Sequence, residues 1–132
     1  MSYLLDTDIC SAYVKGNATV IGRFLQYGGN LHISTITLGE LLTWGLRANA
    51  APRRLTKIRE FLELVSVLDV TPEVAWKFGE IRAALLDAGG RVPEMDLMIA
   101  ASALVNNLTV VTHNTADFAQ IHGLRLEDWL TP

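Results

Sequence analysis

The fold is decided by the run Thr109-Val110-Val111-Thr112 and by the acidic residue that follows it, Asp117. All four residues of the run are β-branched, and such side chains favour a strand because they fit a pleated sheet. The next segment, from Thr115 to Ile121, has the pattern of a short helix. The sequence therefore predicts a strand followed closely by a helix that carries an acidic side chain in its first turn.

The same order of features occurs twice more in the chain. Tyr3-Leu4-Leu5 is a short apolar run that ends at Asp6, and the strand-like run from Leu31 to Ser34 leads into a helix that holds Glu40. Longer helical segments alternate with these runs. Such alternation predicts parallel strands joined by right-handed crossovers, with helices on both faces of the sheet. We therefore expect an α/β fold, a three-layer α/β/α sandwich with a central parallel sheet.

Turn and capping residues set the bounds of the predicted elements. Asn17 and Thr71 are suited to N-cap helices, Pro72 suits the first helical position, and paired glycines close two of the helices. The predicted strands cover residues 3–5, 31–34, 67–70, 109–112 and 124–126. The predicted helices cover residues 9–15, 18–27, 37–49, 52–65, 72–88, 93–106 and 115–121.

Length and composition indicate one folded domain over residues 1–132. Hydrophobic residues make up 50% of the chain and charged residues 19%. In ordinary domains hydrophobic residues make up about 45–50% and charged residues about 25%. This chain is therefore rich in core residues, and a disordered chain is excluded. Cys10 is the only cysteine, and there is neither a basic leader nor an apolar run of membrane length. We expect a cytoplasmic protein with no membrane segment.

The net charge is −3, from 11 basic and 14 acidic residues. This balance argues against a protein that coats nucleic acid non-specifically, because such proteins carry a basic excess. It is compatible with an enzyme that holds a phosphodiester through metal ions. The four acidic residues described next account for more than the whole negative excess.

Four acidic residues lie at or near predicted helix N-termini: Asp6, Glu40, Asp96 and Asp117. Three of them follow strands, whereas Asp96 lies in the first turn of the helix opened by Pro93, with no strand directly before it. Ligand sites in parallel sheets lie at the carboxyl ends of the strands, where these side chains can converge. Converging carboxylates repel one another, and a divalent cation relieves that repulsion. Oxygen ligands without His or Cys suit Mg²⁺ or Mn²⁺, which activate water for attack on a phosphodiester.

Each acidic residue also has a purely structural interpretation. Asp6 can N-cap the helix after it, and Thr37 with Glu40 fits a capping box. Asn114 and Asp117 have the same spacing, and Asp96 can be one more acid in a first turn. Four such coincidences together are less expected than one.

The chain resembles the PIN-domain ribonucleases and, within them, the VapC-type toxins of toxin–antitoxin pairs. The similarity extends over nearly the whole chain and includes four acidic motifs in the family's order. These motifs and the closing segment cover residues 3–9, 33–41, 95–103, 111–118 and 123–129.

The resemblance implies an endoribonuclease that depends on Mg²⁺ or Mn²⁺ and leaves a 5′-phosphate and a 3′-hydroxyl. The family's acidic cluster and metal site would map onto Asp6, Glu40, Asp96 and Asp117, with Asp6 and Asp96 directly on the metal. The resemblance also implies supporting hydrogen bonds from Thr7, Thr112 and Asn114.

The resemblance further implies an RNA substrate, a homodimer and a cognate antitoxin. The predicted helices 37–49 and 52–65 are the candidate antitoxin surface, because Leu41, Leu42, Trp44 and Leu46 extend beyond one apolar stripe. The alternative is that Leu41 and Trp44 belong to the core. Five basic residues between positions 47 and 59 can steer RNA, although a solvated helix face is the favoured interpretation.

One position departs from the family pattern. Asp8 stands where the family usually has Asn or Ser. An additional carboxylate there can bind metal, cap the helix or unsettle the site, and we favour a cap.

Three rival interpretations remain at this stage. Asp6-Thr7-Asp8 resembles the opening of haloacid-dehalogenase-type phosphatases, with Asp6 as nucleophile and Asp8 as acid/base. That pattern expects Thr or Val in place of Cys10 and a later lysine, but no lysine follows Lys77. A receiver domain expects a lysine where this chain has Thr112-His113. The third rival is a PIN-like binding module without catalysis.

Overall fold

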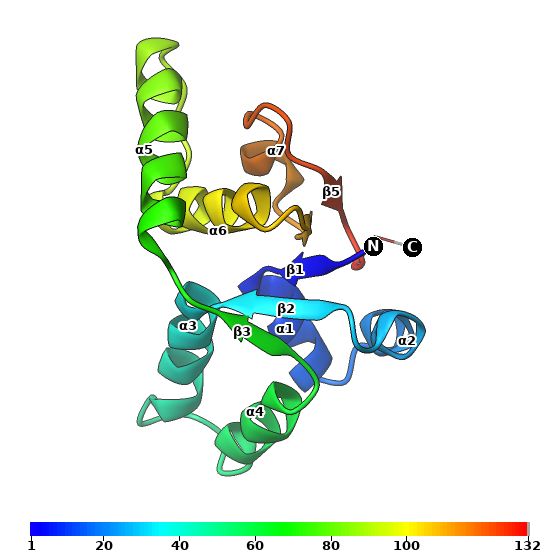
Figure 1. Cartoon of the computed structure of the whole chain (residues 1–132). Helices are drawn as coiled ribbons and strands as arrows, with labels where there is room; N and C mark the ends of the chain where they lie inside the picture. The colour runs from blue at the N-terminus through cyan, green and yellow to red at the C-terminus, as the bar shows by residue number, and fades with distance from the viewer. Residues whose placement is uncertain (132) are drawn as a thin grey trace.

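The computed structural model describes residues 1–131 and contains a five-stranded, fully parallel sheet (Figure 1). Along the sheet the strands lie in the order β3-β2-β1-β4-β5, so β1 is the middle strand and lies between β2 and β4. Every strand pair is parallel. The strands are β1 (Tyr3–Leu5), β2 (Leu31–Ser34), β3 (Ser66–Leu68), β4 (Thr109–Val111) and β5 (Leu126–Glu127).

Helices cover both faces of this sheet. In Figure 1, α1 to α4 lie on one side and α5 to α7 on the other. The helices are α1 (Thr7–Val14), α2 (Ala18–Tyr27), α3 (Thr35–Leu46), α4 (Arg54–Leu62), α5 (Pro72–Asp87), α6 (Glu94–Val105) and α7 (Thr115–Phe118). This arrangement confirms the predicted three-layer α/β/α sandwich.

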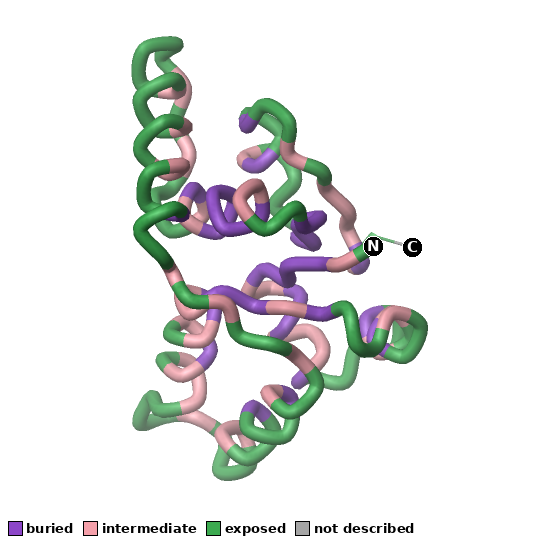
Figure 2. Tube along the Cα trace, viewed as in Figure 1, coloured by how far each residue is buried: buried purple, intermediate pink, exposed green. Residues whose placement is uncertain are grey.

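Strands β1 and β4 supply side chains to the core on both faces of the sheet. Leu5 and Val111 pack in the cluster under α1 to α4, whereas Leu4 and Val110 pack in the cluster under α6 and α7. This follows from the geometry of a strand, in which successive side chains point to opposite faces. Figure 2 shows β1, β4 and much of α6 buried, whereas β3 and most of α5 are exposed or only partly buried.

Small residues let α6 approach the sheet closely. Ala100 and Ala103 are fully buried, as expected if this helix is pressed against β4. Because Asp96 is on the first turn of the same helix, this close approach brings Asp96 towards the carboxyl edge of the sheet. A membrane-spanning helix is absent from residues 1–131, since no helix there combines the necessary length and hydropathy.

The C-terminal segment is held by an aromatic cluster around Trp129, which is only 1% exposed. Its ring stacks on Tyr27 and meets Tyr3 and Phe24 edge-on. Aromatic rings are the largest apolar groups in a core, so this cluster fixes the chain end beside β1.

Several predicted helix bounds are wrong by two or more residues. Helix α1 begins at Thr7 because Asp6 caps it, and α3 begins at Thr35 because the hydroxyl of Ser34 accepts a hydrogen bond from Ile36 N at 3.1 Å. Glu40 is therefore in the second turn of α3. The capping box expected for Thr37 and Glu40 is wrong, and Thr37 is instead buried inside the helix.

The remaining differences concern the ends of three helices and of the two edge strands. Pro93 is the N-cap of α6. Helix α4 begins at Arg54, after a turn, and α7 ends at Phe118. Strand β3 covers 66–68 where 67–70 was predicted, and β5 covers 126–127 where 124–126 was predicted. The N-caps at Asn17 and Thr71 are confirmed by hydrogen bonds to Val20 N and Val74 N.

Two glycines of α3 are expected to respond oppositely to substitution. A Cβ at Gly45 would lie 2.7 Å from Ile58 Cδ1 in α4, whereas a Cβ at Gly39 would meet no atom within 4 Å. Gly39→Ala is expected to raise the free energy of unfolding by about 0.5–1 kcal/mol through helix propensity. Gly45→Ala is expected to lower it by about 1 kcal/mol, because overpacking outweighs that gain. Urea unfolding measures both, and stabilisation by Gly45→Ala would show that α3 and α4 are not packed this closely.

Candidate active site

Asp6 lies at the carboxyl ends of the neighbouring strands β1 and β4. It follows β1, and its backbone N–H donates to the carbonyl of Val111 at the end of β4. One carboxylate oxygen, Oδ1, accepts from Thr7 N at 2.8 Å, and the other, Oδ2, accepts from the Thr112 hydroxyl at 2.8 Å. The structural interpretation of Asp6 as a cap is confirmed, but capping uses only one of its oxygens.

Glu40 reaches the same edge from α3. Its Oε1 accepts a hydrogen bond of 2.6 Å from the hydroxyl of Thr7, the residue after Asp6. This bond connects α1 to α3 across 33 positions of sequence. The structure therefore brings the predicted supporting residue Thr7 into contact with a predicted acidic residue.

Asn114 joins the two remaining acidic residues. Its side-chain amide Nδ2 donates to Asp117 Oδ2 at 2.9 Å and to Asp96 Oδ2 at a longer 3.4 Å. Its backbone N–H donates to the Thr112 hydroxyl at 3.0 Å. Asn114 makes no side-chain cap of α7, so the capping box expected between Asn114 and Asp117 is wrong. The contact between them is instead side chain to side chain.

Burial and mutual repulsion perturb the acidic side chains. Burial, followed by the charge of Asp8 and opposed by hydrogen bonds from Thr112 and Thr7, raises the pKa of Asp6 to about 7. The pKa of Asp96 is raised by burial and then by the charges of Glu40, Asp117 and Asp8. Among residues 1–131, none of the ion pairs formed by Lys, Arg or His includes one of these four acids. Their negative charge is thus concentrated and not neutralised by the protein.

All seven sequence-predicted site residues therefore lie in one hydrogen-bonded region. Thr112 and Asn114 connect Asp6, Asp96 and Asp117, and Thr7 connects the neighbouring Glu40. Within the described part of the chain, no three His, Cys, Asp or Glu side chains form a compact metal cage. The donor set is nevertheless made of carboxylate, hydroxyl and amide oxygens, which is the set preferred by hard cations.

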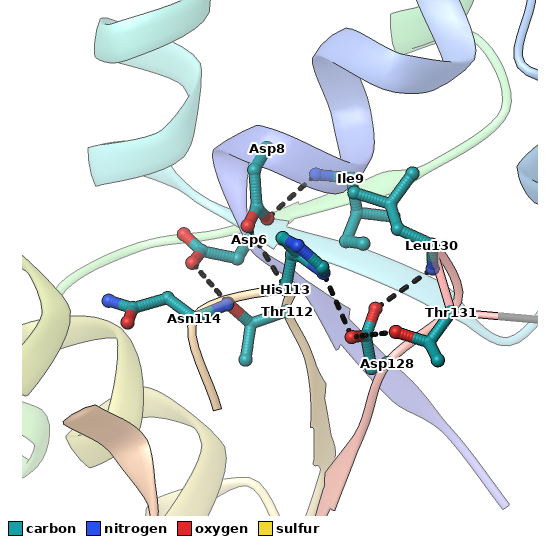
Figure 3. A network of polar contacts seen from close by, with 9 residues as sticks. All are labelled: Asp6, Asp8, Ile9, Thr112, His113, Asn114, Asp128, Leu130 and Thr131. Carbon is teal, nitrogen blue, oxygen red and sulfur yellow. Dashed lines mark hydrogen bonds and ion pairs between the residues drawn. The ribbon is translucent and has the colours of Figure 1, made fainter. Parts of the chain in front are cut away.

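Two further contacts beside this region were not predicted from the sequence. Asp6 is the N-cap of α1, so the cap favoured for Asp8 is wrong, and Asp8 lies in the first turn of that helix. Its carboxylate accepts from Ile9 N at 2.8 Å and from His113 N at 2.9 Å. The His113 ring nitrogen Nδ1 lies 2.9 Å from Asp128 Oδ2. Figure 3 shows Asp6 and the Asn114 amide on one side of the loop 112–114, and Asp128 on the other. Asp128 lies in a segment that the family resemblance included, but no spacing rule pairs it with His113.

Burial also raises the pKa of Asp8, although the hydrogen bonds from His113 and Ile9 oppose this effect. For Asp128 the balance is reversed. Burial tends to raise its pKa, but hydrogen bonds from Thr131, Leu130 and His113 outweigh that and lower it. The loop 112–114 is therefore in contact with two carboxylates, Asp8 and Asp128. Asp8 accepts from the backbone N–H of His113, and Asp128 accepts from that of Leu130.

Comparison with known proteins agrees with this fold. The family described as PIN domain matches residues 3–124, and the chain belongs to this family. Haloacid-dehalogenase phosphatases and receiver domains are thereby removed as alternatives.

Individual relatives lie within the VapC branch. The chain is 38% identical to the tRNA(fMet)-specific endonuclease VapC of Shigella flexneri, with 98% of each chain covered. It is 33% identical to ribonuclease VapC2 of Haemophilus influenzae, over 98% of this chain and 99% of that protein. A crystal structure of DNA-bound VapBC from Salmonella typhimurium matches with a TM-score of 0.92 and 35% identity, over 98% of each chain.

Proposed function

We propose that this protein is a metal-dependent endoribonuclease toxin of the VapC type, which hydrolyses RNA phosphodiester bonds and is neutralised by a cognate antitoxin. The observation that carries the proposal is the convergence of four carboxylates at one edge of a parallel sheet. Burial and the charges of neighbouring carboxylates raise the pKa of Asp6 and Asp96, as expected where acidic side chains are crowded together without a cation. The relatives named as ribonucleases cover the chain almost completely.

The residues present fit a hard divalent cation, Mg²⁺ or Mn²⁺. Asp6 and Asp96 would hold it directly, and Glu40 and Asp117 would complete the acidic cluster. Such a cation supplies Lewis-acid chemistry, since it activates water and stabilises negative charge on a phosphodiester. It would also relieve the repulsion among the carboxylates, which the described Lys and Arg side chains leave uncompensated.

The remaining site residues orient the carboxylates. The Thr112 hydroxyl fixes one oxygen of Asp6, the Thr7 hydroxyl fixes Glu40, and the Asn114 amide holds Asp117 and Asp96. These bonds restrict the rotamers of the acidic side chains before any ligand arrives, which is how a second layer of residues preorganises a site. Water attack would leave a 5′-phosphate and a 3′-hydroxyl.

We also propose that residues 1–132 form one nuclease domain that acts in the cytoplasm as a homodimer. The antitoxin surface is proposed on α3 and α4. Leu41 belongs to the core, but Leu46 is 65% exposed. The Lys15 ammonium and the Arg54 guanidinium each lie over the Trp44 ring, at 5.5 and 4.4 Å from its centroid. One of the five basic residues is thereby engaged in packing, and the others are free to meet RNA or solvent.

The proposal is tested with the purified chain, free of antitoxin, on total RNA and on tRNA(fMet). That tRNA is the first specific substrate to use because the Shigella relative is named for it. We expect cleavage with Mg²⁺ or Mn²⁺ and none with EDTA. Release of phosphate from an aryl phosphate with all RNA intact would contradict the proposal. Intact RNA with no hydrolysis of either substrate would instead favour a binding module.

A further inference from the structure

Asp8 makes a long-range contact that a residue in the first turn of a helix does not need. Its Oδ1 accepts from Ile9 N within α1, but its Oδ2 accepts from the backbone N–H of His113, which is 105 positions away in sequence. The second bond is 2.9 Å long and joins the first turn of α1 to the loop after β4. Asp8 therefore connects two elements that both border the acidic pocket.

The loop that Asp8 contacts is the one that holds the acidic side chains. Thr112, on one side of His113, donates to Asp6, and Asn114, on the other side, donates to Asp96 and Asp117. A shift of the His113 backbone would move both neighbours together, because adjacent residues share rigid peptide planes. Three of the four proposed metal-binding carboxylates thus depend on the position of this loop.

The far side of the loop is anchored separately. The His113 ring contacts Asp128, and Asp128 in turn accepts from Leu130 N and from the Thr131 hydroxyl. Trp129, in the same segment, is buried among aromatic rings. In Figure 3 the Asp8 carboxylate approaches the loop opposite Asp128. The loop therefore has a second attachment that does not involve Asp8, and we expect Asp8→Ala to leave the chain folded.

We propose that Asp8 is a positioning residue for the acidic cluster, which acts by accepting the His113 N–H and so fixes Thr112 and Asn114 against the metal-binding carboxylates. The inference rests on the proposed metal-dependent function and assigns Asp8 no direct contact with metal or RNA. Because the contact requires an acceptor, a neutral carbonyl oxygen at the same place can replace the carboxylate. The proposal therefore assigns the role of Asp8 to the hydrogen bond that it accepts and not to its negative charge.

Asp8→Ala and Asp8→Asn test this assignment in the full chain. Ala removes the acceptor, whereas Asn keeps one acceptor oxygen and loses the charge. In metal-free protein, hydrogen exchange of the His113 amide measured by NMR is expected to be about tenfold faster in Asp8→Ala. In Asp8→Asn it should stay within about threefold of wild type.

Mn²⁺ binding, followed by electron paramagnetic resonance of the free ion, gives the second readout. Asp8→Ala is expected to weaken binding by about 10- to 100-fold, the usual effect of losing a group that orients metal ligands. Asp8→Asn should restore most of that loss. The kcat for RNA should fall with Asp8→Ala while KM is retained, because Asp8 does not touch RNA. Asp87→Ala, which removes an exposed carboxylate at the end of α5, serves as the control and should match wild type.

The outcomes distinguish this inference from the proposed function. Asparagine has one acceptor oxygen, so it keeps the bond from His113 N only by giving up the bond from Ile9 N. If His113 exchange in Asp8→Asn matches wild type and metal binding is still as impaired as in Asp8→Ala, charge or direct metal binding is what matters. Unchanged His113 exchange in Asp8→Ala would show that the bond positions nothing. Either result overturns the inference. A wild type that neither binds Mn²⁺ nor cleaves RNA overturns the proposed function, and amide exchange in the metal-free protein still decides whether Asp8 holds the loop.

Discussion

Asp96→Asn is expected to lower the rate of RNA cleavage by roughly 10³-fold while the protein stays folded. Asparagine has nearly the shape of aspartate, so packing of α6 against the sheet is preserved. The negative charge is lost at the residue whose pKa is raised by three other acids, Glu40, Asp117 and Asp8, after burial. The acidic cluster therefore loses a carboxylate on which the charges of three other acids act. Initial rates on tRNA(fMet) or total RNA in Mg²⁺ measure this effect.

Asp6→Asn is expected to abolish cleavage to the same degree, because Asp6 carries the second carboxylate proposed to bind metal. Asp87→Asn makes the same chemical change on the exposed end of α5 and should cleave like wild type. Both site variants should relieve the growth defect that the chain causes when it is expressed without antitoxin. Cleavage that survives in Asp6→Asn and in Asp96→Asn would remove the acidic cluster from the mechanism.

Asp6→Asn is also expected to stabilise the metal-free protein at about pH 8, on the order of 2 kcal/mol. Asp6 is 7% exposed, and its pKa is raised from 3.8 to about 7, mainly by burial. Above that pH the folded protein holds a buried charge that the unfolded chain solvates freely. Neutral asparagine avoids this charge, although it gives up one of the two hydrogen bonds that the carboxylate accepts.

The direction of the pH dependence follows from this raised pKa. Because the folded pKa is above the unfolded one, the stabilising contribution is fully present below the unfolded value of 3.8 and is lost as pH rises through about 7. In EDTA, wild type should lose stability over this window more steeply than Asp6→Asn. The advantage of Asp6→Asn should shrink continuously as pH falls from about 7 towards 3.8. Thermal unfolding across this pH range measures both curves.

Divalent cation should reverse the ranking of the two proteins. A ligand that binds only the folded state stabilises it by about 2.7 kcal/mol at a concentration of about 100 times its Kd. Saturating Mn²⁺ should therefore raise the Tm of wild type and leave that of Asp6→Asn nearly unchanged. An equal rise in both proteins would mean that the cation binds somewhere else.

The sheet and its acidic edge could be predicted because they depend on local patterns. The β-branched run before Thr112 and the apolar run before Asp6 specify strands on their own, and alternation with helices makes those strands parallel. In a parallel sheet the residues that follow neighbouring strands meet at one edge. The positions of Asp6 and Asp117 were thus set by strand ends that the sequence shows directly.

The helix starts were predicted less well because several residues near each start can cap. Ser34 and Thr37 are both good cap residues, and the choice depends on where β2 ends, which its pairing with β1 and β3 determines. The contact of Asp8 with His113 was not predicted, and for Thr7 the family resemblance implied a supporting hydrogen bond without naming Glu40 as its partner. These two contacts join residues 105 and 33 positions apart, so they depend on the packed arrangement of the elements and on no local pattern.

The central claim is that the carboxylates of Asp6 and Asp96 hold a divalent cation where RNA is cleaved. The most direct measurement is an anomalous difference map from crystals of the wild-type protein soaked in Mn²⁺. The account predicts a peak in contact with both carboxylates and its absence from Asp96→Asn crystals. Wild-type protein that cleaves RNA in the same Mn²⁺ buffer, yet shows no peak at these two side chains, would contradict it.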